Sequence, residues 1–244
     1  MKAILRRTLR SLGWDVFRYP QSCEKIDAHL AQLFARRRFD LVLDVGANLG
    51  QFGREVRRAG YPGPMVSFEP IPEVAARLKE TVASDPKWVV YQYALGRSDG
   101  SLPFNVTKST DFSSFLKPDL ECGKTFSEGS LIERVIEVPV RRLDGLLFEC
   151  QTVVRSSGQS ILLKMDTQGF DDAVLDGAAG CLDGVTGVIT EVSVRPLYTG
   201  AQRYLEAIAR LEHLGFELTG LFPVNRDSEL RILEFNCVML RPTG

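Results

Sequence analysis

The chain has 244 residues, of which 44% are hydrophobic and 25% charged, a composition typical of a globular protein with one large α/β domain or two small ones. Five scattered cysteines without C-x-x-C spacing argue against a disulfide framework and a zinc site, and no apolar run approaches the ~20 residues of a membrane span. We therefore expect a cytoplasmic protein, and the net charge of −1 gives no global signal for a nucleic-acid partner.

The first predicted unit is an N-terminal helical arm, residues 1–38, which precedes the main domain, residues 39–244. The arm carries nine Lys or Arg and three acidic residues, whereas the remainder carries 21 and 28. Hydrophobic spacing predicts a basic amphipathic helix over 2–18, without the h-region of a signal peptide, and a second helix over 24–37. The first helix could lie on an anionic membrane, which would make the protein peripheral to the inner face of that membrane. Because its apolar side is short, we favour packing of this helix on its own domain.

From Phe39 the chain alternates predicted strands and helices. An apolar run that ends in a glycine-rich turn is typical of a buried parallel strand. In chain order we expect a strand at 41–44, a helix through 49–56, a strand at 65–68, a helix through 74–82 and a strand at 88–93. Together these elements form a βαβαβ half of a doubly wound sheet.

The middle of the chain departs from this alternation. Residues 101–107 and 135–140 are predicted strands without helical partners, and a polar loop over 108–130 lies between them. We expect this stretch to be an insertion that covers the ligand-binding edge of the sheet.

Regular alternation then resumes towards the C-terminus. The predicted elements are a strand at 161–166, a helix at 171–182, a strand at 187–191, a helix at 203–214 and strands at 216–221 and 235–240. The whole pattern predicts a Rossmann-like α/β fold with about seven strands, mostly parallel, and an antiparallel last pair.

The turn after the first strand, 44–50 (DVGANLG), carries the first functional signal. Gly46 would let the backbone approach a ligand, and Gly50 would allow close packing where the next helix begins. A dinucleotide-binding loop reads G-x-G-x-x-G and places a pyrophosphate at the helix N-terminus. Here Asp44 precedes the loop, and a carboxylate suits the cationic sulfonium and ammonium groups of S-adenosylmethionine better than a pyrophosphate.

A second acid follows at the end of the next strand. Glu69 lies 25 residues after Asp44, at a place where an acid accepts hydrogen bonds from ribose hydroxyls. Taken singly, Asp44 could be a turn or capping residue and Glu69 an ordinary surface acid. Because both stand at the ends of adjacent predicted strands, we favour binding of S-adenosylmethionine.

The chain resembles the FkbM-like family of methyltransferases over roughly residues 40–240. The matching segments are 44–52 (DVGANLGQF), 68–73 (FEPIPE), 94–96 (ALG), 113–114 (SS), 140–144 (VRRLD), 163–169 (LKMDTQG) and 191–193 (EVS). With the strand-end argument, the resemblance implies a class I methyltransferase fold and a cofactor site formed by Asp44, Gly46, Ala47, Asn48, Gly50, Phe52, Glu69, Pro70, Ala94, Leu95 and Asp166.

The resemblance also implies the reaction, which is O-methylation of a hydroxyl on a sugar or secondary metabolite. Family members act on deoxysugars of actinobacterial glycolipids and on polyketide macrolides, and we favour a glycolipid sugar as the acceptor. One departure from the family is Gln168, which stands where the family usually has an acid before a glycine. A glutamine preserves a hydrogen bond there but not a charge.

Methyl transfer to a hydroxyl requires in-line alignment of the reacting atoms and a base that takes the proton. The two histidines, His29 and His213, lie in predicted helices away from strand ends, so we expect surface or packing roles for them. Asp166 and Glu191 follow the fourth and fifth regular strands and are the predicted catalytic residues, although Asp166 could instead cap the next helix.

The same two carboxylates could hold a divalent cation, but we favour a metal-free site because no third ligand is evident. Lys164 could simply pair with an acid. The predicted acceptor-binding residues are Ser113, Ser114, Gln168 and Tyr198.

Two other functions remain open. An RNA or protein methyltransferase would need a basic patch or aromatic platform near the acceptor site, whereas here the basic residues gather in the arm. It would also often carry an Asn-Pro-Pro-Tyr-type motif where this chain has 166–169 (DTQG). A non-catalytic nucleoside-binding protein could keep the same fold.

Overall fold

The computed structural model describes residues 25–119, 128–157 and 159–243. The helix predicted over 2–18 lies outside the described residues, as do Cys23 and Cys122. None of the described helices combines the length and hydropathy needed to cross a membrane.

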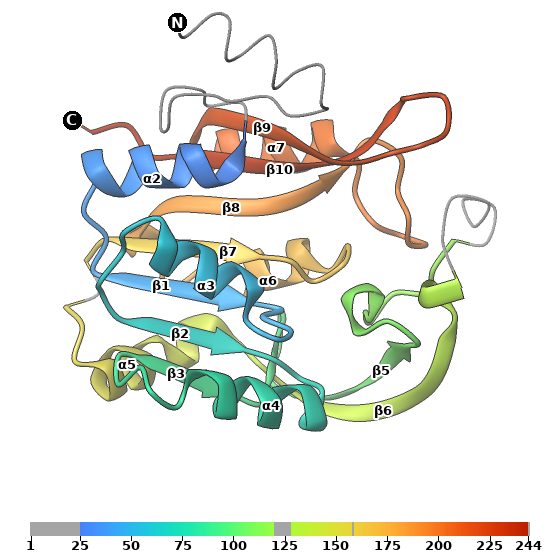
Figure 1. Ribbon diagram of the computed structural model, residues 1–244, viewed down its shortest axis with the longest axis horizontal. Coiled ribbons are helices and arrows are strands. Elements are labelled where there is room, and N and C mark those ends of the chain that lie inside the picture. Colours follow the sequence, from blue (N-terminus) through green and yellow to red (C-terminus); the bar gives the residue numbers. More distant parts are fainter. Residues whose placement is uncertain (1–24, 120–127, 158, 244) are drawn as a thin grey trace, which may run out of the picture.

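The centre of the molecule is a seven-stranded sheet in the order β3-β2-β1-β7-β8-β10-β9 (Figure 1). All neighbouring pairs are parallel except those of β10, which runs antiparallel to both β8 and β9. The strands are β1 (Leu41–Val45), β2 (Met65–Phe68), β3 (Trp88–Tyr91), β7 (Ile161–Met165), β8 (Val185–Ser193), β9 (Glu217–Arg226) and β10 (Ile232–Leu240). The predicted Rossmann-like architecture with an antiparallel last pair is confirmed.

Helices cover both faces of this sheet because its strands are apolar on both sides. The helices are α2 (Ile26–Arg36), α3 (Gln51–Arg58), α4 (Pro72–Val82), α5 (Leu143–Val154), α6 (Asp171–Gly177) and α7 (Tyr204–His213). Apolar residues of α5, α6 and α7 join one core with Leu41, Leu43 and Val45 of β1. Those of α2, α3 and α4 join a second core with Val42, on the opposite face. Alternation along β1 therefore places Asp44 on the α2–α4 side.

The predicted insertion forms a separate three-stranded sheet in the order β4-β6-β5. It consists of β4 (Ala94–Leu95), β5 (Gly100–Thr107) and β6 (Ile132–Arg141), with a short 3₁₀ helix at Thr110–Phe112. A third apolar core joins this sheet to the start of α4 through Ile71 and Val74. Figure 1 shows β5 and β6 beyond the carboxyl ends of the parallel strands, where the insertion was expected.

Two predicted boundaries were wrong by five residues each. The helix predicted to reach residue 182 ends at Gly177, because two glycines within 177–180 (GAAG) disfavour helix continuation. The strand predicted to end at 221 continues to Arg226 through Pro223. A proline is tolerated there because β9 is an edge strand, where a missing N–H need not break a hydrogen bond of the sheet.

Candidate active site

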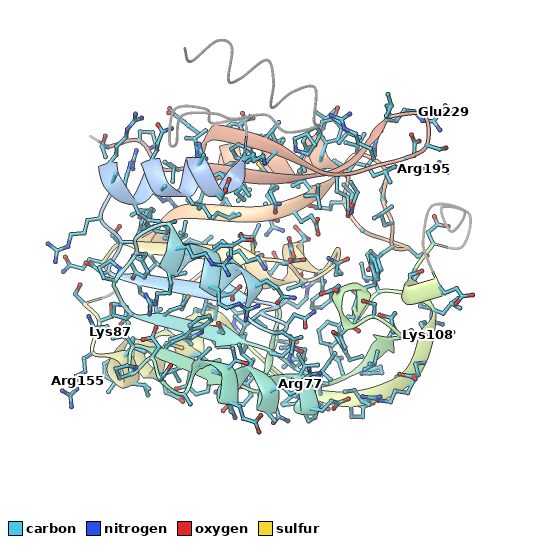
Figure 2. All side chains as sticks on the ribbon, in the orientation of Figure 1. Arg77, Lys87, Lys108, Arg155, Arg195 and Glu229 are labelled. Atoms are coloured by element: carbon cyan, nitrogen blue, oxygen red, sulfur yellow. The ribbon has the colours of Figure 1, made fainter. Side chains whose placement is uncertain are left out.

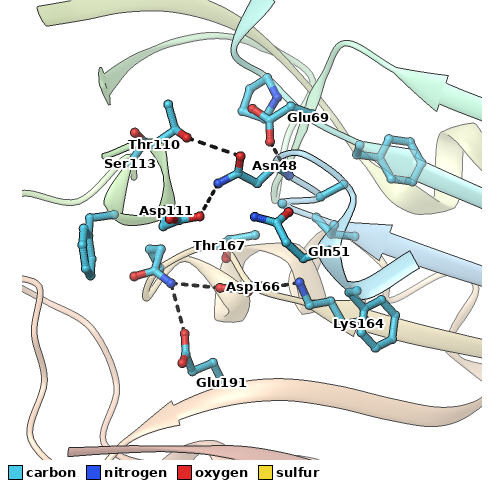
Figure 3. A pocket seen from close by; sticks show the side chains of 18 of the residues that line it. Asn48, Gln51, Glu69, Thr110, Asp111, Ser113, Lys164, Asp166, Thr167 and Glu191 are labelled. Atoms are coloured by element: carbon cyan, nitrogen blue, oxygen red, sulfur yellow. Dashed lines mark hydrogen bonds and ion pairs between the residues drawn. The ribbon is translucent and has the colours of Figure 1, made fainter. Parts of the chain in front are cut away.

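A cavity of about 400 Å³ opens at the carboxyl ends of the parallel strands (Figure 3). The predicted site residues among its lining are Gly46, Ala47, Asn48, Phe52, Glu69, Pro70, Ala94, Leu95, Ser113, Asp166, Gln168 and Glu191. The structure thus brings together residues from the glycine-rich turn, the insertion and two strand ends. Four predicted residues are not among the lining: Asp44, Gly50, Ser114 and Tyr198.

The glycine-rich turn takes a backbone conformation that requires its glycines. Gly46 has φ +74°, and a Cβ atom built on it would lie 2.1 Å from the backbone oxygen of Asp166. Gly50 has φ +79° at the N-cap of α3, where a Cβ atom would lie 2.5 Å from Leu78. The turn therefore packs directly on the backbone of Asp166, immediately after β7.

Asp44 lies beneath this turn rather than in the cavity. Its carboxylate is fully buried, accepts a hydrogen bond from Ser67 (3.2 Å) and lies 3.5 Å from the ammonium of Lys164. Burial raises the pKa of Asp44, and Lys164 opposes that rise. Because Lys164 neutralises it, Asp44 provides a weaker argument against a pyrophosphate than the sequence suggested.

Lys164 lies between two carboxylates. Its Nζ is 3.1 Å from Asp166 as well as 3.5 Å from Asp44, and it lies 5.4 Å from the ring centre of Phe52. Burial lowers the pKa of Lys164, but Asp166 and Asp44 outweigh it and raise the pKa overall. The side chain is therefore a cation that links the two halves of the site.

Glu69 lines the cavity at the end of β2, where a ribose-binding acid was predicted. One carboxylate oxygen accepts the backbone N–H of Asn48 and the other that of Ile71, each at 2.9 Å. Burial raises the pKa of Glu69 to about 7, although these two hydrogen bonds lower it. Each oxygen keeps a second lone pair that a ligand hydroxyl can use.

The insertion contacts the glycine-rich turn through Asn48. The Asn48 amide donates to Asp111 (2.6 Å), and Thr110 donates to the amide oxygen of Asn48 (3.3 Å). Asp111 and Thr110 also line the cavity. The sequence analysis missed both residues, because nothing in the polar loop distinguishes them from its other hydroxyl and acidic side chains.

Gln168 joins the two predicted catalytic carboxylates. Its Nε2 donates to Asp166 (2.9 Å) and to Glu191 (3.1 Å), as the dashed lines in Figure 3 show. Its backbone has φ +52°, which is uncommon for a residue other than glycine. Ser114 donates to its carbonyl oxygen (2.8 Å), and the Tyr198 hydroxyl is 2.8 Å from its Oε1. Ser114 and Tyr198 thus contact Gln168, whose side chain faces the cavity.

Glu191 does not end its strand as predicted, because β8 continues to Ser193. Burial raises the pKa of Glu191 well above its usual range, and the nearby carboxylates of Asp166 and Glu234 raise it further. A carboxyl group with a raised pKa accepts protons more readily near neutral pH. The pair formed with Asp166 can therefore orient a hydroxyl group and remove its proton.

The C-terminal hairpin, β9 and β10, contributes three polar lining residues that the sequence analysis missed: Asn225, Glu234 and Asn236. Glu234 is 5% exposed and accepts hydrogen bonds from Asn225 (3.1 Å) and Ser193 (3.2 Å). The signal was present in β10, whose otherwise apolar sequence has polar residues at alternate positions 234 and 236.

Neither histidine lines the cavity. His29 is 3.2 Å from the Thr219 hydroxyl, and burial lowers its pKa; His213 is exposed and contacts the backbone oxygen of Ala209 (2.6 Å). Within the described part of the chain, no three His, Cys, Asp or Glu side chains are arranged to hold a metal ion.

Comparison with known protein sequences gives matches to methyltransferases. Residues 44–218 match the methyltransferase FkbM domain family. The chain is 28% identical over 228 residues to the 2-O-methyltransferase NoeI of Sinorhizobium fredii, a match that covers 90% of this chain and 88% of that protein.

Solved structures with a similar fold include a putative methyltransferase from Thermobifida fusca, to which this chain is 13% identical. The TM-score is 0.53, and the match covers 89% of this chain and 79% of that chain. Another is magnesium protoporphyrin IX methyltransferase from Synechocystis with bound S-adenosylmethionine, with a TM-score of 0.49, 11% identity, and 99% and 97% covered.

Proposed function

The chain belongs to the FkbM methyltransferase family and is an S-adenosylmethionine-dependent methyltransferase, and from this premise we propose that it methylates a hydroxyl group of a sugar. The acceptor that we favour is a deoxysugar of a glycolipid or of a similar secondary metabolite. One observation carries the proposal: two carboxylates, Asp166 and Glu191, face the cavity and are held together by Gln168. The similar protein NoeI is a 2-O-methyltransferase, which also supports transfer to oxygen.

The hydrogen-bonding groups and the charge of the cavity suit S-adenosylmethionine. Gly46 allows the close approach of a ligand, and Glu69 keeps lone pairs for ribose hydroxyls. The charged lining residues are six acids and one lysine: Glu55, Glu69, Asp111, Asp166, Glu191, Glu234 and Lys164. This excess of negative charge favours a ligand with sulfonium and ammonium groups.

The residues of the acceptor side have distinct roles in the proposed reaction. When bound, S-adenosylmethionine supplies an electrophilic methyl group at this cavity. Asp166, held by Lys164 and Gln168, accepts a hydrogen bond from a neighbouring hydroxyl of the sugar and so orients the ring, which leaves the proton of the reacting hydroxyl directed to Glu191. Glu191, whose pKa is raised by burial, takes the hydroxyl proton as the nucleophile forms its new bond.

The test combines binding and turnover. Calorimetry with S-adenosylmethionine measures cofactor binding, and labelled methyl transfer to extracted lipids, deoxysugar glycosides and macrolides measures activity. We expect Asp166→Asn and Glu191→Gln to bind the cofactor normally while losing turnover by about 10²–10⁴-fold. Asp183→Asn is the matched control, because Asp183 is exposed just before β8 begins, at the other end of the sheet.

Two outcomes would contradict the proposal. Absence of S-adenosylmethionine binding at millimolar concentration would remove its basis. Near-normal turnover in both carboxylate variants would remove Asp166 and Glu191 from the reaction.

A further inference from the structure

Five polar side chains form one continuous row along the last three strands of the sheet. In the pairing of β8 with β10, Glu191 lies opposite Asn236 and Ser193 opposite Glu234. In the pairing of β10 with β9, Glu234 lies opposite Asn225. Because side chains alternate along a strand, Glu191 and Ser193 share one face with Glu234 and Asn236. We refer to these five residues as the polar row.

The polar row faces the cavity, not the core on the other side of the sheet. Glu191, Asn225, Glu234 and Asn236 all line the cavity, which also contains Asp166. Val192, between Glu191 and Ser193, is buried in the apolar core on the opposite face, and Phe235, between Glu234 and Asn236, packs against that core. The row therefore continues the acceptor side of the site away from the glycine-rich turn.

Hydrogen bonds within the polar row hold its groups in place. Glu234, although 5% exposed, accepts from Asn225 and Ser193, and Glu191 accepts from Gln168. These bonds satisfy Glu234, the buried member of the row, and each carboxylate oxygen keeps a second lone pair that a ligand hydroxyl in the cavity can use. Carboxylates and amides together match the donors and acceptors of a sugar ring.

The two carboxyl groups of the polar row restrict the charge of the ligand that can bind there. Among the described lining residues Lys164 is the one cation, and its ammonium is directed to Asp44 and Asp166. An anionic group placed against Glu191 and Glu234 would meet two carboxylates without a compensating cation from the lining. A hydroxyl-rich ring without charge would meet only hydrogen-bonding groups.

We propose that the polar row is the acceptor subsite of this cavity and that it selects an uncharged, hydroxyl-rich ring over an anionic one. The ring lies on the side chains of the C-terminal hairpin and presents two neighbouring hydroxyls, one to Asp166 and the reacting one to Glu191. This inference rests on the proposed methylation of a sugar hydroxyl and adds the chemical class of the sugar and the residues that bind it.

The experiment measures binding of defined glycosides to the full chain with S-adenosylhomocysteine present. Saturation-transfer NMR titrations compare methyl α-L-rhamnopyranoside and methyl α-D-glucopyranoside with the anionic methyl α-D-glucuronide. We expect at least one neutral glycoside to bind and the glucuronide to bind at least ~10-fold more weakly.

Variants of the polar row test whether its residues determine the preference for neutral over anionic glycosides. Glu234→Gln and Asn236→Leu should weaken neutral glycoside binding by ~10-fold or more, and Glu234→Gln should also narrow the preference for neutral over anionic sugar. Affinity for S-adenosylhomocysteine should change less than ~2-fold in both. Glu229→Gln is the control on the same hairpin, since Glu229 is exposed at its turn and pairs with Arg231 (Figure 2).

The inference is overturned if the glucuronide binds as well as the neutral glycosides, if none of the glycosides binds, or if both row variants bind them normally. Its failure is distinguishable from failure of the proposed function. Cofactor binding and methyl transfer to a hydroxyl of another acceptor, without binding of any glycoside, would refute only the subsite. Absence of cofactor binding would refute both.

Discussion

Replacing Lys164 with methionine should destabilise the protein strongly, because it would leave Asp44 as an unpaired buried charge. Asp44 is fully buried, and Lys164 is 7% exposed with its ammonium 3.5 Å from the Asp44 carboxylate. Methionine keeps the length and apolar stem of lysine, so the packing near Phe52 is largely preserved while the charge is lost.

The expected loss follows from the geometry. Two unit charges 3.5 Å apart interact by about 5 kcal/mol at an effective dielectric constant of about 20, and breaking a buried ion pair by removing one partner typically costs about 3–5 kcal/mol. For a chain of this size, a loss of about 3–5 kcal/mol corresponds to a fall in Tm of roughly 6–20 °C.

The pH dependence of this loss has a definite sign. Burial raises the pKa of Asp44 in the folded state, and the positive charge of Lys164 partly offsets that rise. Removal of Lys164 therefore raises the pKa of Asp44 further. A carboxyl with a raised folded pKa gains stability as pH falls and loses it as pH rises through that pKa. The stability difference between Lys164→Met and the unsubstituted protein should therefore be largest at neutral and alkaline pH and shrink in acid.

Urea and thermal unfolding of three variants test this reasoning. Adding Asp44→Asn to Lys164→Met should restore most of the lost stability, since it removes the uncompensated charge. Lys79→Met, at an exposed position of α4, controls for the substitution itself. A loss below about 1 kcal/mol in Lys164→Met, or a double variant no more stable than the single one, would refute the account.

Three further predictions concern the cavity. Gly46→Ala should cost about 1–3 kcal/mol of stability and abolish cofactor binding, because its Cβ would collide with the backbone of Asp166; normal calorimetric binding would contradict this. Gln168→Glu should move the acidic limb of the kcat profile to higher pH, since a third carboxylate raises the pKa of Glu191; an unmoved profile would refute the role of Gln168. Cofactor affinity should fall as pH drops below about 7, where Glu69 gains a proton and binds ribose less well, and Glu69→Gln should flatten that dependence in titrations at several pH values.

Local signals made the first half of the fold predictable. The apolar run at Leu41–Val45 and the glycines after it are patterns of a few consecutive residues that indicate a buried strand and a tight turn. The βαβαβ half and the glycine-rich turn could therefore be predicted from the sequence. The sequence analysis also suggested that Lys164 could pair with an acid, and the structure shows it beside both Asp166 and Asp44.

The acceptor side was less predictable because its residues meet only through long-range pairing. Asn225 and Glu234 reach the cavity through the antiparallel register of the last strands, which no local pattern specifies. Tyr198 was predicted to bind the acceptor, but it does not line the cavity and instead donates a hydrogen bond to the Gln168 side chain, a position that depends on tertiary packing.

The direct packing of Gly46 on the backbone of Asp166 has a consequence for how this family can diversify. The glycine-rich turn and the backbone of Asp166 form one packed unit, joined also by the hydrogen bond from Asp166 N–H to the Val45 oxygen. The insertion and the C-terminal hairpin approach this unit from separate segments of the chain. We therefore expect that exchange of either segment changes which acceptor is methylated without moving the glycine-rich turn or Asp166.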